Sequence, residues 1–370
     1  MNGSKHAQRG RGWLPWAAAG TALVAGGVIG GVIVAATSSP ASGAAPSSTS
    51  PPSSSEVSAC AVTRVANQVI PSVVTISASG QGGSGTGSGE VIRSGGYILT
   101  NNHVIAIAAH GGSVKVLFSD GQTAAATIVG RDPQTDLAVL KVQTSNQLKV
   151  IPLGNSSAVK VGEAAVVVGA PLGLSGTVTS GIVSALDRTI EVPAENDTSA
   201  LLVSAIQSDA SINPGNSGGA MVNCAGQLIG VPTAGATVPS SGGESSGGSI
   251  GLGFAIPVDL AKTIADEIIA TGRVTHAYFG LATLPIPPAA AQQAGVPEGL
   301  YVQTVAPGSP ADHAGLRAGD VITTINGDAA TSNIQLQELT LTKKPGDTVS
   351  LGYSRDGSSA KTTVTLGTQP

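Results

Sequence analysis

Ten short runs rich in β-branched or small apolar residues follow one another along the middle of the chain, separated by Gly, Pro, Asn and Asp. Runs of this length and spacing predict β-strands, and so many of them predict a sandwich or a pair of barrels. The runs are Val73–Ser77, Tyr97–Thr100, Val114–Phe118, Ala124–Val129, Leu137–Val142, Ala164–Val168, Gly176–Ser184, Leu201–Gln207, Ala220–Val222 and Gln227–Val231. Charged residues make up only 11% of the chain, less than half the usual share of about 25%, which excludes a long helical or coiled-coil protein.

One clear helix is predicted after these runs, over Val258–Thr271. Leu260, Ile264 and Ile268 recur every fourth residue, Pro257 precedes the segment, and Gly272 follows it as a stop signal. We expect this helix to close the β-rich domain.

The N-terminal residues indicate where in the cell the protein is located. Trp13–Ala36 is a run of 24 mostly apolar residues, about 36 Å of helix at about 1.5 Å per residue, enough to span a bilayer core of about 30 Å. A cleaved signal peptide is the alternative, although its apolar region is normally only about 7–15 residues long. Because the bases of residues 1–12 precede the run, we expect a cytoplasmic N-terminus and an exported remainder of the chain.

Residues 37–57 are almost entirely Ser, Pro, Ala, Gly and Thr, a composition too poor in apolar side chains to form a core. They are predicted to be a solvated linker.

Cys60 and Cys224 follow on the exported side, where disulfides persist, so we expect a bridge between them. Two buried, unpaired thiols are the alternative.

The charge balance and the motif inventory exclude several function classes. Residues 56–370 carry 15 basic and 22 acidic side chains, a net charge of −7, which disfavours nucleic acid as a partner. No pair among the four histidines outside the motifs below has metal-ligand spacing, so no metal site is expected. These histidines are His6, His110, His276 and His313. No phosphate loop or dinucleotide fingerprint occurs, and we expect no cofactor.

Three segments carry residues suited to nucleophilic catalysis. A strand ends by delivering His103 into a loop, Asp136 immediately precedes an apolar strand, and glycines flank Ser217 in a turn of small residues. Each alone has an ordinary structural explanation. Together they supply an imidazole that takes the proton of a serine hydroxyl and a carboxylate that orients and stabilises the imidazole. Backbone N–H groups of Gly215 and Ser217 could stabilise the resulting oxyanion.

These segments resemble the catalytic blocks of the HtrA (high-temperature requirement) family of trypsin-like serine proteases, with similarity extending over residues 61–368. The blocks are Thr100–Val104, Asp132–Leu140 and Ile206–Gly219. The resemblance implies a protease domain over 58–272, built from two six-stranded β-barrels with the site between them. It implies His103 as base, Asp136 as orienting acid and Ser217 as nucleophile.

The sequence departs from the family at two positions beside these blocks. Glu90 stands where the family usually has an apolar residue, and Ala220 replaces the usual proline. We expect both to affect local packing more than chemistry. The resemblance implies a homotrimer, although the aromatics that clamp the trimer in several relatives are absent before the first barrel of this chain.

The resemblance also places a substrate pocket beside the nucleophile, lined by Ser211, Ile212, Gly251 and Phe254. These residues offer no acid for Arg or Lys, which implies cleavage after small or medium aliphatic residues. Asp209 lies close by, and a turn acid bonded to the backbone is its simpler interpretation. The loop at 231–249 is expected to gate the pocket. The segment 186–199 resembles the sensor loop of the family, with a merely solvated loop as the alternative.

Residues 273–370 resemble a PDZ domain. Four of its segments follow at PDZ-like spacing: Gly299–Val305, Ser309–Ala311, Ala314–Ile322 and Ile325–Gly327. Such a domain binds an extended C-terminal peptide as an added strand. The loop Tyr278, Phe279, Gly280 and Leu281 matches the one that receives the peptide carboxylate, and an ordinary turn with both aromatics in the core is the alternative. We expect a groove helix over Asn333–Leu341 and a hairpin formed by 348–353 and 360–366.

The sequence therefore predicts an exported, membrane-anchored serine endopeptidase that degrades unfolded or misfolded envelope proteins and recognises exposed C-termini. A PDZ-bearing holdase or scaffold, in which the protease domain serves only for binding, is the competing class. A pure binder has no need of His103, Asp136 and Ser217 together.

Overall fold

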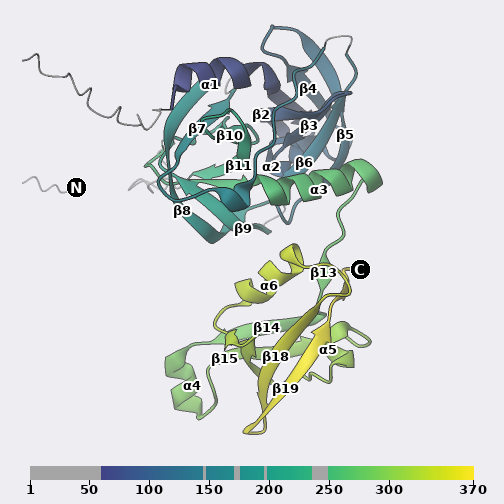
Figure 1. Cartoon of the computed structure of the whole chain (residues 1–370). Helices are drawn as coiled ribbons and strands as arrows, with labels where there is room; N and C mark the ends of the chain where they lie inside the picture. Colours follow the sequence, from purple (N-terminus) through teal and green to yellow (C-terminus); the bar gives the residue numbers. More distant parts are fainter. Residues whose placement is uncertain (1–59, 145–146, 171–175, 196–197, 236–248) are drawn as a thin grey trace, which may run out of the picture. The chain divides into compact units, whose positions relative to one another are not determined.

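The computed structural model describes residues 60–144, 147–170, 176–195, 198–235 and 249–370. Its first part consists of two closed six-stranded barrels, drawn in purple to green in Figure 1. The first barrel has the order β1-β2-β3-β6-β5-β4, and the second β10-β11-β12-β9-β8-β7. All neighbouring strands in both barrels are antiparallel. The two-barrel architecture implied by the resemblance is confirmed.

The strands of the barrels follow the predicted runs. They are β1 (Val73–Gly80), β2 (Gly83–Arg93), β3 (Tyr97–Thr100), β4 (Ser113–Leu117), β5 (Thr123–Asp132), β6 (Leu137–Val142), β7 (Ala164–Gly169), β8 (Thr177–Pro193), β9 (Ser199–Ser208), β10 (Ala220–Val222), β11 (Leu228–Gly235) and β12 (Gly253–Pro257). All ten predicted runs are confirmed as strands. The structure adds β2 and β12, and it corrects the interpretation of 186–199 as a loop. Leu186–Pro193 continues β8, whose pairing with β9 passes through several register shifts.

Helix α3 (Val258–Thr271) joins the two barrels and has the predicted bounds. It contacts β5 and β6 of the first barrel and β11 and β12 of the second. Its buried face carries Val258, Ala261, Ile264, Ala265 and Ile268, which share one apolar cluster with residues of both barrels. Because removing this surface from water stabilises the fold, the helix fixes one barrel against the other.

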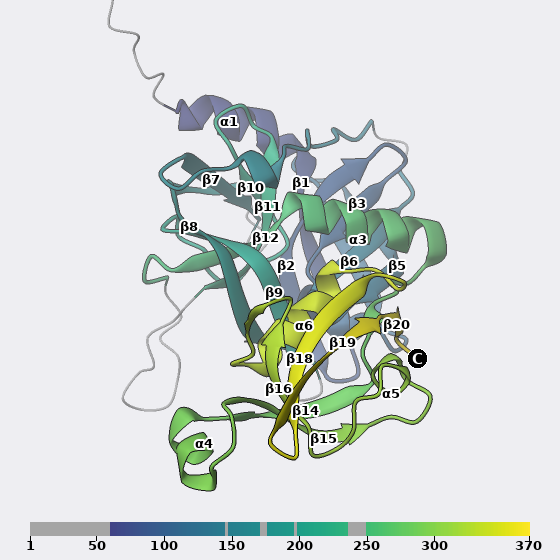
Figure 2. The ribbon, with the colours of Figure 1, turned by 60° about the horizontal axis from the view of Figure 1, so that its bottom comes forward.

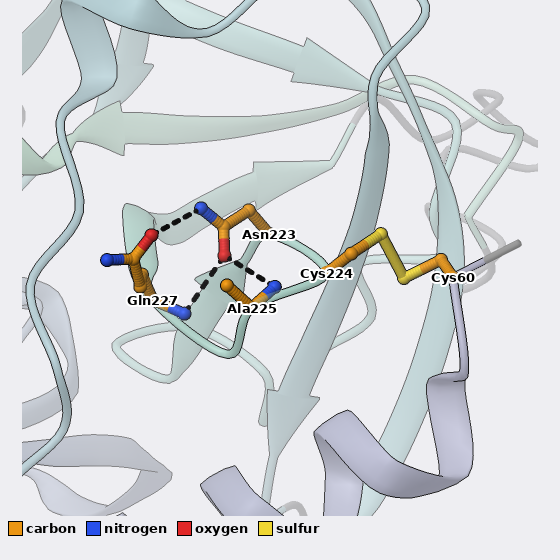
Figure 3. The surroundings of a disulfide bond; sticks show 5 residues. All are labelled: Cys60, Asn223, Cys224, Ala225 and Gln227. Atoms are coloured by element: carbon orange, nitrogen blue, oxygen red, sulfur yellow. Dashed lines mark hydrogen bonds between the residues drawn. A yellow bond between two sulfur atoms is a disulfide. The ribbon is translucent and has the colours of Figure 1, made fainter. Parts of the chain in front are cut away.

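A disulfide joins Cys60 to Cys224, as predicted. It ties the chain just before helix α1 (Val62–Val69) to the turn between β10 and β11 (Figure 3). In that turn the Asn223 side chain accepts hydrogen bonds from the N–H groups of Ala225 and Gln227. The bridge therefore anchors α1 to an already rigid turn of the second barrel.

The remaining residues form a separate α+β domain, in green to yellow in Figure 2. Its strands are β13 (Ala277–Tyr278), β14 (Leu281–Ile286), β15 (Gly299–Val305), β16 (Val321–Ile325), β17 (Asp328–Ala329), β18 (Thr348–Arg355), β19 (Ser358–Thr365) and β20 (Gly367–Thr368). Its helices are α4 (Pro288–Ala294), α5 (Pro310–His313) and α6 (Asn333–Thr342). The helix predicted over 333–341 and the terminal hairpin are confirmed as α6 and β18–β19, whereas the peptide groove beside α6 stays a prediction.

The N-terminal segments expected to be an anchor, residues 13–36, and a linker, residues 37–57, lie outside the described residues. Among the helices that the structure does describe, none combines the length and apolar character needed to cross a membrane.

Candidate active site

His103 and Asp136 are brought together at the edge of the first barrel. The chain leaves β3 at Thr100 and turns directly into the short helix α2 (Asn102–Ile105), which carries His103. Asp136 is the residue before β6. The imidazole Nδ1 of His103 lies 2.8 Å from Oδ2 of Asp136. Since a carboxylate only accepts hydrogen bonds, Nδ1 carries the proton and Nε2 is left as the basic nitrogen.

Asp136 is held from several sides. Its Oδ1 accepts the backbone N–H of His103 at 2.9 Å, and its carbonyl accepts from Asn102 N at 3.1 Å and Asn101 Nδ2 at 2.9 Å. The residue is 4% exposed and adopts φ 57°, a left-handed conformation that non-glycine residues rarely take. Such a conformation costs on the order of 1–3 kcal/mol, and it persists only where the surroundings hold it. Here the hydrogen bonds to the Asp136 carbonyl and carboxylate hold the backbone in place.

Thr233, in β11 of the second barrel, contacts both ends of the predicted triad. Its side-chain hydroxyl donates to Oδ2 of Asp136, and its backbone carbonyl accepts from the Ser217 hydroxyl at 3.3 Å. The sequence reasoning missed this residue. No local signal marks it, because its position depends on how the two barrels meet.

Ser217 lies in the turn that ends at β10. Its carbonyl accepts the N–H of Ser88 at 2.9 Å, and its hydroxyl hydrogen bonds, among the described residues, to Thr233 and not to His103. Gly215 adopts φ 99°, and its carbonyl is held by Ser88 Oγ at 2.6 Å. Within the described part of the chain, the N–H groups of Gly215 and Ser217 donate to no acceptor, whereas those of Asn216, Gly218 and Gly219 do. Two free donors beside a serine are the chemistry of an oxyanion site.

The expected pocket residues are only partly at a surface. Ile212 is buried in the core of the second barrel, and Phe254 packs against the cluster between the barrels. The Ser211 carbonyl accepts a hydrogen bond from Thr179 Oγ1 at 2.8 Å. A Cβ added at Gly251 would have no heavy atom within 4 Å. The side chains of Ile212 and Phe254 thus take part in core packing, and a substrate pocket formed by these four residues stays a prediction of the resemblance.

Asp209 accepts the backbone N–H of Ile182 at 2.7 Å, which agrees with the turn-acid interpretation. Most of the loop expected to gate the pocket, residues 236–248, lies outside the described residues.

Comparisons with known proteins agree with this geometry. Residues 87–231 match a trypsin-like peptidase domain and residues 274–366 a PDZ domain. The chain is 42% identical to serine protease PepD of Mycobacterium tuberculosis over 83% of its own length and 66% of PepD. It is 40% identical to the periplasmic serine endoprotease DegP of Escherichia coli over 78% of its own length and 60% of DegP. It therefore spans about two thirds or less of the length of these curated relatives.

Solved structures give the same result. The HtrA-type protease AlgW, solved with a decapeptide, superposes with a TM-score of 0.66 at 32% identity, covering 84% of this chain and 99% of AlgW. The chain belongs to the HtrA family. A serine endoprotease from Yersinia pestis superposes with a TM-score of 0.62 at 33% identity over 84% of this chain and 98% of the other.

The PDZ loop of this HtrA-family chain follows β13. Phe279 is buried in the domain core, which is the packing that an ordinary turn would also give. Gly280 adopts φ 78°, and its carbonyl accepts from Ala306 N at 2.8 Å. In the described residues the N–H groups of Phe279 and Gly280 donate to no acceptor, and strand β14 beyond them is an edge strand. Both features suit the reception of a peptide terminus.

The departure from the HtrA family at Glu90 has a physical cost. The side chain is fully buried in β2, between Val73 of β1 and Leu99 of β3, and among the described residues neither carboxyl oxygen has a hydrogen-bond partner. Burial raises the pKa of the Glu90 carboxyl well above its ordinary value. The other departure, Ala220, is buried in β10 beside the core between the barrels.

Proposed function

We propose that the chain is a serine endopeptidase of the cell envelope that cleaves unfolded or misfolded proteins. In this proposal His103 is the general base, Asp136 orients it, and Ser217 is the nucleophile. The observation that carries it is the 2.8 Å contact between His103 Nδ1 and Asp136 Oδ2, which leaves Nε2 free to accept a proton.

The reaction follows from these groups. Ser217 Oγ attacks the scissile carbonyl while His103 Nε2 takes its proton, and the developing negative charge is stabilised by the N–H groups of Gly215 and Ser217. The protonated imidazole stays paired with Asp136 and then donates its proton to the leaving amine. Water repeats the sequence to release the acyl group.

A rotation of the Ser217 side chain precedes the attack. In the structure the hydroxyl donates to the Thr233 carbonyl, so turning about the Cα–Cβ bond must exchange this acceptor for His103 Nε2. The same observation favours a second candidate, a holdase in which the serine stays turned away. Phosphonylation of Ser217 by a small active-site-directed phosphonate ester separates the two, because Ser217 Oγ displaces the leaving group from phosphorus in a working protease, whereas a holdase would not react.

The PDZ domain over 273–370 supplies recognition of C-termini in this proposal. An extended peptide would add to the free edge of β14, beside α6, with its carboxylate received by the N–H groups of Phe279 and Gly280. The side-chain amide of Asn333 on α6 donates to the Thr283 carbonyl of β14 at 3.0 Å, which fixes one end of this groove.

The envelope location is supported by the sequence and by the relatives. DegP and DegQ of Escherichia coli are periplasmic by name. We propose that residues 13–36 anchor the chain in the membrane, that residues 37–57 are the linker, and that the protease domain occupies 58–272. Secretion after signal cleavage is the alternative. A homotrimer stays a prediction of the family resemblance.

The test is proteolysis of a reduced, unfolded protein substrate, with the Ser217→Ala variant as the matched control. Wild-type cleavage after small or medium aliphatic residues, absent in the variant, supports the proposal. Equal cleavage by both proteins contradicts it.

A further inference from the structure

His276 lies just after α3, at the start of the PDZ segment, and its side chain reaches back to the protease domain. Its Nε2 is 2.9 Å from Oδ1 of Asp132, at the end of β5. Both side chains are buried, with relative exposures of 7% and 4%. Since the carboxylate can only accept, Nε2 of His276 carries the donated proton.

His276 is itself fixed by its neighbours. The N–H of Thr275 donates to Glu267 Oε1 of α3 at 2.8 Å, and the carbonyl of His276 accepts from Gln369 N at 3.0 Å. The imidazole therefore has little freedom to leave Asp132. A buried, fully hydrogen-bonded pair of this kind makes the groups that it joins more rigid.

Asp132 organises the turn that carries the predicted orienting acid. Its Oδ2 accepts from Thr135 Oγ1 at 2.5 Å, and its Oδ1 also accepts from Gln134 N at 3.2 Å. Thr135 is 1% exposed and directly precedes Asp136, whose left-handed φ of 57° must be held by its surroundings. Because Thr135 and Asp136 are consecutive, the hydrogen bond that holds Thr135 also restricts the backbone from which the Asp136 carboxylate projects.

The opposite side of the same turn is held by the second barrel. The N–H of Leu201 in β9 donates to the Gln134 carbonyl at 2.9 Å. Arg131, the residue before Asp132, pairs through Nη1 with Glu195 at 2.6 Å and with Asn102 Oδ1 at 3.2 Å. Of the side chains bonded to Asp132, His276 is the one that comes from the PDZ segment.

We propose that His276 is a positioning residue for proteolysis. By donating from Nε2 to Asp132 it completes the hydrogen bonding of the Asp132–Asp136 turn, and so sets the orientation of Asp136 against His103. The inference rests on the proposed triad. It gives the PDZ segment a part in building the active site, separate from peptide binding at Phe279 and Gly280.

The test compares His276→Ala, which removes the donor, with His276→Gln, whose amide nitrogen can replace Nε2. His313→Ala, an exposed histidine of the same domain, is the matched control. The rate of Ser217 phosphonylation by a small active-site probe is measured in the 370-residue chain, with kcat and KM for a short peptide. The low-field proton resonance of His103 Nδ1–H reports directly on its bond to Asp136.

We expect His276→Ala to lower phosphonylation and kcat by about tenfold to a hundredfold, because small misplacements of reacting groups cost this much. KM should change less than about twofold, and His276→Gln should recover most of the loss. The His103 resonance should shift or broaden in the alanine variant alone. Unchanged phosphonylation and an unchanged resonance in His276→Ala would overturn the inference.

Two other outcomes have defined meanings. If His276→Ala does not fold, His276→Asn against His276→Gln serves instead, since the asparagine amide is too short to reach Asp132. If the wild type neither cleaves nor reacts with the probe, the proposed function fails, and the His103 resonance still decides the role of His276.

Discussion

Thr233 donates its side-chain hydroxyl to the carboxylate of Asp136, across the boundary between the two barrels. The same carboxylate oxygen lies 2.8 Å from His103 Nδ1, so a residue of the second barrel helps to aim an imidazole of the first. The site therefore depends on how the barrels are joined as well as on the three residues that would perform the chemistry.

The first prediction concerns this hydroxyl. Thr233→Val keeps the shape of the side chain and removes the donor to Asp136. A hydrogen bond to a charged group contributes about 1.5–3 kcal/mol, so kcat should fall by about tenfold to a hundredfold while KM stays nearly constant. Thr127→Val, on an exposed position of β5 whose hydroxyl bonds to the Lys141 carbonyl, is the control. Equal kcat values for wild type and Thr233→Val would remove the proposed role.

The second prediction concerns the unpaired carboxyl of Glu90. Its pKa is raised in the folded state, so above about pH 4.5 the unfolded chain loses a proton that the folded chain keeps. The stability contributed by this group is present below that pH and is lost as pH rises towards the folded pKa. Glu90→Leu should stabilise the fold by about 1–3 kcal/mol at pH 8 and by less at pH 5.

Thermal unfolding at the two pH values measures this difference. Glu163→Gln, which removes an exposed carboxylate, is the control and should show no such pH-dependent gain. A gain from Glu90→Leu that is the same at pH 5 and pH 8 would contradict the raised pKa.

The third prediction concerns the bridge between Cys60 and Cys224, whose residues are 164 apart in the sequence. Closing so long a loop restricts the unfolded chain, by up to about 5 kcal/mol in the loop-entropy model. The double variant Cys60→Ser with Cys224→Ser should unfold at a lower temperature and retain cleavage at low temperature. Two free thiols in the exported, unfolded wild type would show that the bridge does not form.

The fourth prediction concerns the PDZ loop. A peptide with a free C-terminal carboxylate should bind at least about tenfold more tightly than its amide, since charge-assisted bonds to backbone N–H groups are lost with the charge. Gly280→Ala should abolish this preference, because the residue has φ 78° and its Cβ would lie 2.2 Å from Ser309 Cβ. Gly346→Ala, also at positive φ but in open space, is the control. Equal affinities for the two peptides would refute carboxylate recognition at this loop.

Much of the fold could be predicted because its strands carry local signals. Leu137–Val142 and Ala220–Val222 have the predicted bounds, and α3 begins and ends where its period and Gly272 indicate. Strand β2 escaped prediction because Gly83–Arg93 is rich in glycine and owes its extended form to pairing with β1. Helix α1 was missed because it is short and lacks a side-chain cap.

Sequence motifs predict the three residues of the proposed triad, but no motif predicts the hydrogen bonds that hold these residues in place. Thr233 and Asp136 are 97 residues apart in the sequence, and His276 and Asp132 are 144 apart, so no local sequence pattern marks either hydrogen bond. His276 could be read only as a histidine without metal-ligand spacing. Such contacts are set by tertiary packing, which determines the partner of a buried polar group only after the barrels have closed.

The most direct measurement is cleavage of an unfolded protein by the wild-type chain and by Ser217→Ala, with the product termini read by mass spectrometry. The account predicts fragments ending in small or medium aliphatic residues from the wild type and intact substrate from the variant. Fragments from both proteins, or none from the wild type even with a peptide bound at the PDZ domain, would contradict it.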